Sequence, residues 1–301
     1  MTIREASPPV LPPFLRPELP FRRRAIEVAG KRIHFIDEGR GRPVLLQHGN
    51  PTWSYLWRKV IRALGGEFRL IAPDLPGLGL SYKPRDVSAH SLAINVDMVG
   101  AVVDYLGLED LILVGQDWGG PVAAGVGERF PERVGGMVWA NTAVLRPARP
   151  FRPKGFHRFA NRPLVSDLVF RSTVFPVPVL DRVQGDKSSI GVLEKRAYYW
   201  PLRKLRDRAA PLALARMIPT SEAHPTTKVM DRIGSYVEAY PGPAALVWGK
   251  RDPILGRALG RHQRALPQAK TWETGAGHFL QEEVPETIAE AIRSVARTPN
   301  R

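Results

Sequence analysis

Short apolar runs alternate with stretches of helical periodicity along most of this 301-residue chain. Apolar runs of four to seven residues that end in turn-forming residues predict buried strands. The runs lie at 43–47, 70–73, 111–114, 134–140, 244–248 and 270–273. Apolar side chains at 92, 96, 99, 103 and 106 recur at helical spacing before Gly107, a suitable helix cap, and further helices are predicted at 55–64 and 285–295. This alternation predicts an α/β fold with a mostly parallel, twisted sheet flanked by helices.

Two segments depart from the alternating pattern. Residues 25–28 and 32–36, on either side of Ala29-Gly30-Lys31, predict a β-hairpin. Between about 143 and 230 the pattern is lost, and Pro, Arg and Phe residues accompany irregular helical patches. We therefore expect a mainly helical cap at 143–230, inserted between a first core part at 1–142 and a second at 231–301.

Composition narrows the picture further. A hydrophobic content of 44% is enough for one large domain with an insertion. The chain has no cysteine, which excludes disulfides, cysteine nucleophiles and thiolate metal sites and fits a cytoplasmic protein. The chain contains no run of about 18 apolar residues, so we expect no membrane span. The N-terminal region reads as a Pro-rich loop rather than a signal peptide.

The net charge of +15 suggests either a nucleic-acid or anionic-surface partner or a solvated, arginine-rich surface. The arginines are spread over most of the chain, and their densest groups, at 22–24 and 203–208, are short. No known nucleic-acid-binding motif accompanies them. We therefore favour the solvated surface and expect neither a nucleic-acid nor a membrane partner.

The candidate chemistry centres on Gly115-Gln116-Asp117-Trp118-Gly119-Gly120, which follows an apolar strand and precedes a small-residue helical stretch. This strand–turn–helix setting is that of a nucleophile elbow, and Asp117 occupies the position that usually holds serine. A carboxylate is ionised at neutral pH. Its attack on an ester would give an anhydride, whereas attack on a saturated carbon that bears a leaving group gives a stable ester. The alternative is an ordinary turn with Asp117 as a helix cap.

Two later loops carry the partners that a hydrolytic second step requires. Asp252 follows the strand at 244–248, and His278 lies in a Gly-rich loop between the last strand and the last helix. The order nucleophile, acid, histidine is the one used by α/β-hydrolases. Asp252 would orient His278, which would then take a proton from water as general base.

Hydrogen-bond donors complete the candidate site. The loop after the strand at 43–47 contains His48-Gly49-Asn50-Pro51. Backbone N–H groups of Asn50 and Trp118 can form an oxyanion hole, and their side-chain donors would suit a leaving anion. Alternatively, Asn50 is a turn residue and Trp118 a core aromatic.

These segments resemble the haloalkane dehalogenases of the α/β-hydrolase superfamily. The matching stretches are 48–58, 72–79, 115–120 and 277–283. The resemblance implies that Asp117 is the nucleophile, His278 the base and Asp252 the acid, with Asn50 and Trp118 as the halide-binding pair. It also implies a small apolar halogenated substrate, a halide product and no cofactor or metal.

The acid and halide pair resemble those of the third subfamily of these dehalogenases, which hints at a homo-oligomer. Some members carry a Glu after the strand that precedes the cap, but this chain has Asn141-Thr142 there. Two positions depart from the family pattern: Trp53 replaces a small residue, which would narrow the pocket, and Leu80 replaces an Asp.

Other functions remain open at this level. Epoxide hydrolases share the elbow aspartate and use cap tyrosines, for which Tyr198 and Tyr199 are candidates, but they usually carry an aromatic residue at the position of Asn50. A fluoroacetate-type dehalogenase would need an arginine for its acid substrate, and no single arginine stands out. A non-catalytic binding protein of the same fold would be expected to lack a triad member, and none is missing here.

Overall fold

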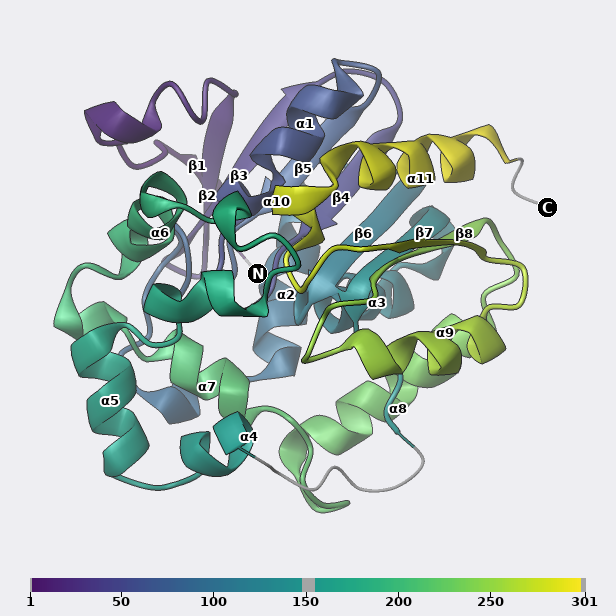
Figure 1. The fold of residues 1–301 in the computed structure, drawn as a ribbon. Helices are drawn as coiled ribbons and strands as arrows, with labels where there is room; N and C mark the ends of the chain where they lie inside the picture. Colours follow the sequence, from purple (N-terminus) through teal and green to yellow (C-terminus); the bar gives the residue numbers. More distant parts are fainter. Residues whose placement is uncertain (1, 148–154, 299–301) are drawn as a thin grey trace.

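A nine-stranded sheet forms the centre of the computed structural model, which describes residues 2–147 and 155–298 (Figure 1). The spatial order of the strands is β1-β2-β3-β5-β4-β6-β7-β8-β9. Their bounds are β1 Ile3–Ala6, β2 Arg23–Val28, β3 Lys31–Gly39, β4 Pro43–Gln47, β5 Arg69–Pro73, β6 Leu111–Asp117, β7 Val134–Thr142, β8 Ala244–Gly249 and β9 Lys270–Thr274. Strands β1, β2, β3 and β5 pair antiparallel in that order, and β5, β4, β6, β7, β8 and β9 pair parallel.

The parallel register brings the ends of the central strands to one edge. Gln47 at the end of β4 is opposite Gly115 of β6, and Asp117 is opposite Thr142 at the end of β7. The register of β6 and β7 shifts between Gln116 and Asp117. Ligand sites of open α/β sheets lie outside the carboxyl ends of the strands, and this edge is where the elbow lies.

Helices cover both faces of the sheet. Their bounds are α1 Arg58–Leu64, α2 Leu92–Tyr105, α3 Gly119–Arg129, α4 Gly155–Ala160, α5 Val165–Thr173, α6 Val192–Tyr199, α7 Ala210–Arg216, α8 Pro225–Glu238, α9 Leu259–Ala265, α10 Leu280–Glu283 and α11 Pro285–Arg297. Helix α11 packs against α1 and against β6, β7 and β8, whereas α2, α3 and α8 pack on one another on the opposite side (Figure 1). Helix α9 lies beside β8.

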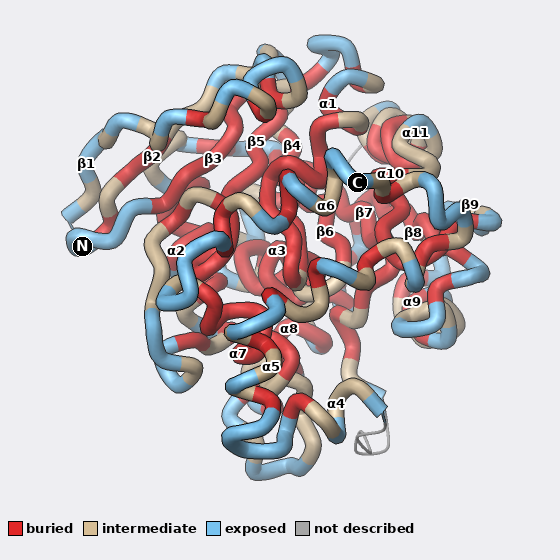
Figure 2. Tube along the Cα trace, turned by 60° about the vertical axis from the view of Figure 1, so that its left-hand side comes forward, coloured by how far each residue is buried: buried red, intermediate tan, exposed pale blue. Residues whose placement is uncertain are grey.

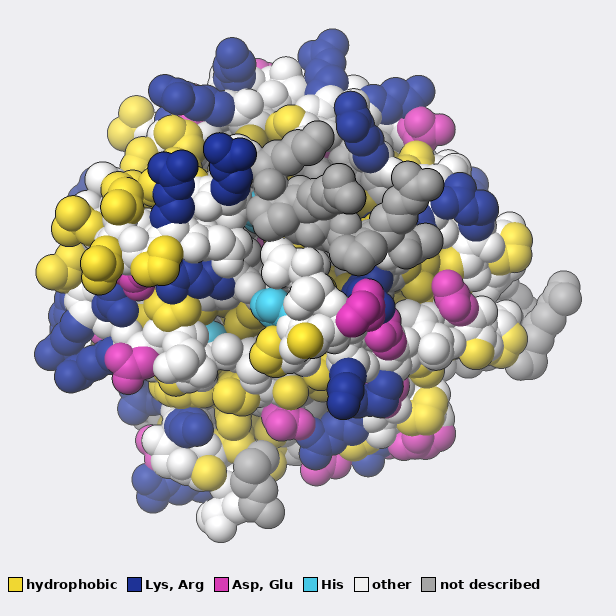
Figure 3. Space-filling view, turned by 90° about the horizontal axis from the view of Figure 1, so that it is seen from below, with side chains coloured by type: hydrophobic (Ala, Val, Ile, Leu, Met, Phe, Trp, Pro, Cys, Tyr) yellow, Lys and Arg dark blue, Asp and Glu magenta, His cyan; other side chains and the backbone are white. Residues whose placement is uncertain are grey.

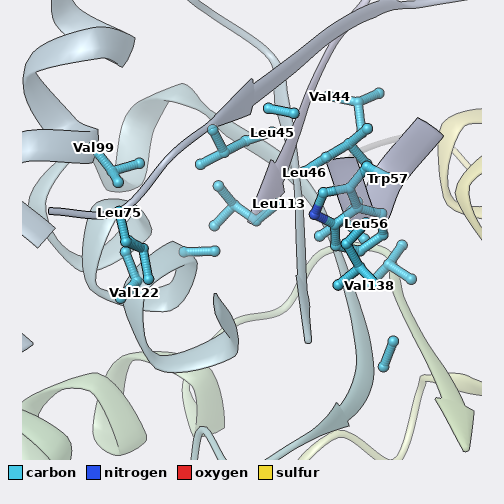
Figure 4. Close-up of a cluster of buried hydrophobic side chains, with 14 of the residues drawn as sticks. Val44, Leu45, Leu46, Leu56, Trp57, Leu75, Val99, Leu113, Val122 and Val138 are labelled. Carbon is cyan, nitrogen blue, oxygen red and sulfur yellow. The ribbon is translucent and has the colours of Figure 1, made fainter. Parts of the chain in front are cut away.

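The core lies on both faces of the central parallel strands β4, β6, β7 and β8, which are buried along almost their whole length (Figure 2). In β4, Leu45 points to the opposite side from Val44 and Leu46, because successive side chains of a strand alternate (Figure 4). Leu45 is opposite Leu113 of β6 in the register. Trp57, also fully buried, packs on the side of Leu46. Strands covered on both faces explain why the sequence shows continuous apolar runs rather than alternation.

Most of the predicted core elements are confirmed. The strand at 43–47 has the predicted bounds, and the other predicted strands are found within about two residues at most ends. The helix predicted at 55–64 is instead a short 3-10 turn, Ser54–Trp57, followed by α1. Strand β1 was not predicted, because Ile3–Ala6 contains two charged residues and lies at the sheet edge, so it shows no apolar run. The α/β fold with a mostly parallel sheet is therefore correct.

The segment predicted as a cap contains α4 to α7 and several 3-10 turns, the longest at Val177–Val183. Helices α4, α5 and α7 contact one another. A second buried cluster lies between them, made by Ala160, Phe170, Leu212 and Ala215. Helix α8 begins within the predicted segment and packs against α2 and α3 of the core. The division at 143–230 stays a prediction.

The surface agrees with the solvated-arginine interpretation. Lys and Arg side chains are scattered over the face shown in Figure 3, with Asp and Glu among them. Many arginines are neutralised locally: Arg133 pairs with Asp104, and Arg146 pairs with Glu222 and Asp231. That no nucleic acid binds stays a prediction.

Candidate active site

Asp117 lies at the turn between β6 and α3 with a φ of 52°, in the left-handed region that non-glycine residues seldom adopt. Thr142 fixes this backbone, because its hydroxyl donates to the Asp117 carbonyl at 2.6 Å. Gly119 follows so close to β4 that a Cβ atom would overlap the Gln47 carbonyl. Only glycine fits there, so the small residues of the elbow let this strained turn pack against the neighbouring strand.

The structure brings the three predicted triad residues together. The Nδ1 atom of His278 is 3.0 Å from Oδ2 of Asp252, and its Nε2 atom is 3.7 Å from Oδ2 of Asp117. His278 and Asp252 are buried, whereas the Asp117 side chain keeps an exposure of 16%. The carboxylate that would act as nucleophile is therefore the member of the trio that a small molecule can reach.

The carboxylates around His278 favour its protonated form. Burial alone would lower the pKa of His278, but the Asp252 and Asp117 carboxylates outweigh it and raise that pKa above the ordinary value. Burial raises the pKa of the Asp117 carboxyl, while His278 and backbone N–H groups oppose that rise. The three groups thus form one coupled cluster in which each carboxylate stabilises the imidazolium.

Backbone donors converge on Asp117 from two loops. The Asn50 N–H donates to Oδ1 of Asp117 at 2.8 Å, and the Trp118 backbone N–H also stabilises this carboxylate. Oδ1 therefore occupies a hole of the oxyanion type. Oδ2 is the oxygen that lies on the side of His278.

The two side chains predicted to bind halide lie beside the elbow. One N–H of the Asn50 amide donates to the carbonyl of Pro211, in cap helix α7, at 3.0 Å. A primary amide has a second N–H, which this contact leaves available. No described residue accepts a hydrogen bond from the Trp118 indole. The contact with Pro211 was not foreseen, since nothing in the cap sequence marks a carbonyl that would orient Asn50.

The hydroxyls of the two tyrosines considered as epoxide acids, Tyr198 and Tyr199, bond to groups other than Asp117. The Tyr198 hydroxyl donates to Glu282 at 2.6 Å within a buried cluster that includes Arg58, which itself pairs with Glu282. Tyr199 is 40% exposed, and its hydroxyl accepts from Arg208 at 3.4 Å. Both tyrosines therefore have partners elsewhere.

The two departures from the family pattern serve the local structure. Trp53 is 1% exposed, and its indole N–H donates to the Ala197 carbonyl of α6 at 3.1 Å, which ties the core to the cap. The backbone N–H of Leu80 donates to the buried Asp74 at 2.7 Å. Whether Trp53 narrows the pocket stays a prediction.

Sequence reasoning missed two supporting side chains. Asn141, noted only for its lack of a carboxylate, donates to the carbonyl of Gly277 at 2.7 Å and accepts from the Gly249 N–H at 2.9 Å. It thereby joins the loops that carry His278 and Asp252. The Nε2 atom of Gln116 lies 3.1 Å from the His278 carbonyl and 3.2 Å from its ring Nε2. The signal that the sequence offered was their position, since each residue is next to last in a central strand.

Within the described part of the chain, no group of three or more His, Cys, Asp or Glu residues is arranged to hold a metal ion. Among the same residues, no helix combines the length and apolar character needed to cross a bilayer.

The family model for the alpha/beta hydrolase fold matches residues 42–285. Haloalkane dehalogenase 2 of Mycobacterium bovis is 34% identical over 285 residues, which cover 91% of this chain and 94% of that protein. The chain belongs to the haloalkane dehalogenase family. A crystal structure of the haloalkane dehalogenase DbeA from Bradyrhizobium elkani USDA94 superposes with a TM-score of 0.81 at 28% identity, covering 90% of this chain and 96% of that one.

One similar protein is named for a different reaction. A curated relative from Shewanella oneidensis, named cis-3-alkyl-4-alkyloxetan-2-one decarboxylase, is 28% identical over 282 residues, covering 91% of this chain and 88% of that protein. Membership of the haloalkane dehalogenase family confirms the fold and the enzyme class predicted above. The third-subfamily assignment, the homo-oligomer and the cytoplasmic location stay predictions.

Proposed function

We propose that the protein hydrolyses haloalkanes to an alcohol, a halide and a proton through an alkyl ester on Asp117. The observation that carries this proposal is the position of Asp117, with Oδ1 held by the Asn50 backbone N–H and Oδ2 facing the Asp252–His278 pair. A carboxylate placed this way is suited to displacement at a saturated carbon followed by hydrolysis. The family membership supports the same reaction class.

In the first step, Oδ2 of Asp117 attacks the carbon that bears the halogen. The carbon–halogen bond breaks, and the halide leaves with the bonding electron pair. The free amide N–H of Asn50 and the indole N–H of Trp118 would receive it as hydrogen-bond donors. Two donors in a site largely shielded from water stabilise a developing anion strongly.

In the second step, His278 takes a proton from water, and the resulting hydroxide adds to the Cγ atom of Asp117. The oxyanion forms on Oδ1, where the backbone N–H groups of Asn50 and Trp118 stabilise it. Collapse of this intermediate releases the alcohol oxygen, which receives the proton from His278. The Asp117 carboxyl that remains loses its proton to solvent, which regenerates the carboxylate and gives the third product. Asp252 keeps the imidazole in the tautomer that presents Nε2 as the base.

An epoxide hydrolase is the runner-up, since it would use the same nucleophile. Its ring oxygen needs an acid at the site, and the two tyrosines best suited by position, Tyr198 and Tyr199, have partners elsewhere. Asn50 presents a donor that suits a halide. These contacts favour the dehalogenase.

A substrate panel tests the proposal. We expect bromide and proton release in equal amounts from 1-bromoalkanes and from 1,2-dibromoethane, and no diol from styrene oxide. The panel includes a cis-3,4-dialkyl oxetan-2-one, because that ring also presents a leaving oxygen on a saturated carbon and one relative is named for this substrate. Ion chromatography and gas chromatography measure the products. Turnover of the oxetanone or the epoxide alone would contradict the proposal.

The pH profile tests the role of Asp252. Because His278 must be neutral to act as base, activity should fall as the pH drops through its raised pKa, above the ordinary value of about 6.5. Asp252→Asn removes the main charge that raises this pKa, so the acid limb should move to lower pH. The rate at the plateau should drop by up to about 10⁴-fold, as for comparable triads. Steady-state bromide release from pH 5 to 10 measures both, and an unmoved limb would exclude this role for Asp252.

A further inference from the structure

The loop that carries His278 is held by the cap as well as by the core. On the core side, Asn141 donates to the Gly277 carbonyl and Gln116 to the His278 carbonyl. On the cap side, the His278 backbone N–H donates to the Val183 carbonyl at 2.9 Å. The peptide of the candidate base is therefore fixed from both directions.

The next cap residue, Gln184, is joined to the residue after the base. Its Oε1 atom accepts from the Phe279 N–H at 2.9 Å, and its Nε2 atom donates to the Phe279 carbonyl at 3.2 Å. Gln184 is 6% exposed. A buried amide with both ends satisfied holds its partner in one position, because losing either bond would leave a polar group unpaired.

Glu283 makes the third connection. Its carboxylate accepts backbone N–H groups from Gly277 at 2.8 Å, Gly185 at 3.0 Å and Asp186 at 2.8 Å. One donor belongs to the histidine loop and two belong to the cap. Hydrogen bonds to a charged acceptor are about twice as strong as neutral ones, so this carboxylate clamps the two segments together.

The two segments approach as closely as backbones can. A Cβ atom on Gly277 would overlap the Val183 carbonyl and lie within 2.5 Å of the Gln184 Cα atom. Glycine beside the base thus permits contact with the cap, in addition to any freedom that it gives the loop.

We propose that Glu283 and Gln184 are positioning residues for the general base, so that hydrolysis of the alkyl ester depends on the cap segment 183–186. This inference rests on the function proposed above. The contacts of Asp117 with Asn50, Trp118 and Thr142 involve neither residue. The contacts of Glu283 and Gln184 with both segments are called the clamp below. Formation of the ester is therefore independent of the clamp, whereas hydrolysis of the ester requires His278 to remain close to Asp117.

Transient kinetics separate the two steps. In Glu283→Ala and Gln184→Ala we expect a burst of one bromide per active site at the wild-type rate constant. Steady-state turnover should be about 10- to 100-fold slower, since a shift of about 1 Å can cost 10² in rate. Glu283→Gln keeps one acceptor oxygen, so its steady-state turnover should lie between those of the wild type and Glu283→Ala. Rapid-quench bromide assays measure both phases, and thermal melting identifies variants that fold.

Glu273→Ala is the matched control. Glu273 is next to last in β9, the strand before the same loop, and is paired only with Lys250 among described residues. Its substitution should leave both phases unchanged. A purely structural role would slow the burst and the turnover by the same factor, and that result, or no change in either, would overturn the inference. If Glu283→Ala fails to fold, Gln184→Ala and Glu283→Gln carry the same test.

Failure of the proposed function would look different, because the wild-type protein would release no bromide. The clamp is then read from amide hydrogen exchange at Gly277, His278 and Phe279. Faster exchange in Gln184→Ala and Glu283→Gln than in wild type and Glu273→Ala supports the clamp. Equal exchange in all four proteins overturns it.

Discussion

Asp117→Ala is expected to lower bromide release from 1-bromoalkanes by about 10⁴- to 10⁶-fold, the scale of loss seen when a covalent nucleophile is removed. Asp252, the other carboxylate bonded to His278, cannot replace it, because Asp252 is buried and also accepts from the Ile254 N–H. Ion chromatography that can detect one bromide per active site measures the loss. Release at the wild-type rate would exclude Asp117 as the nucleophile.

The chain supplies a matched control for this substitution. Asp110 lies at the other end of β6 and has the same φ of 52°, so alanine there meets the same backbone cost. That cost is about 1–2 kcal/mol for a left-handed residue. Asp110 is exposed and pairs with Arg42, far along the strand from the elbow. Asp110→Ala should therefore lose comparable stability and keep full activity.

His278→Phe is expected to convert the enzyme into a single-turnover reagent. Ester formation needs only Asp117 and the leaving-group donors, so one bromide per active site should be released. Hydrolysis needs the base, and without it steady-state turnover should fall by about 10³-fold or more. A bromide assay at high enzyme concentration measures both. The double variant Asp117→Ala/His278→Phe is the control, and it should release no bromide at all.

The strands and helices of the core could be predicted because each is marked by a pattern within one short stretch of sequence. Strand β4 reads as a continuous apolar run, and its bounds match the prediction. The elbow could be predicted because Gly115, Asp117 and Gly119 stand at the spacing that a tight strand-to-helix turn requires. The proximity of His278 and Asp252 could be predicted because both follow strand ends, which a parallel sheet gathers at one edge.

The contacts made by the cap could not be predicted. They depend on backbone carbonyls, such as those of Pro211 and Val183, and a carbonyl has no signature in the amino-acid sequence. Tyr198 shows the same limit for side chains, since its position suggested an acid for epoxides whereas its hydroxyl bonds Glu282. Irregular segments carry no periodicity from which their packing can be derived.

The alkyl ester on Asp117 is the central claim, and the intact mass of His278→Phe after incubation with 1-bromobutane tests it most directly. The account predicts that the whole protein gains the mass of one butyl group less one proton. Proteolysis should place this mass on the peptide that contains Asp117. Bromide release from a protein of unchanged mass, or a butyl group on any other residue, would contradict it.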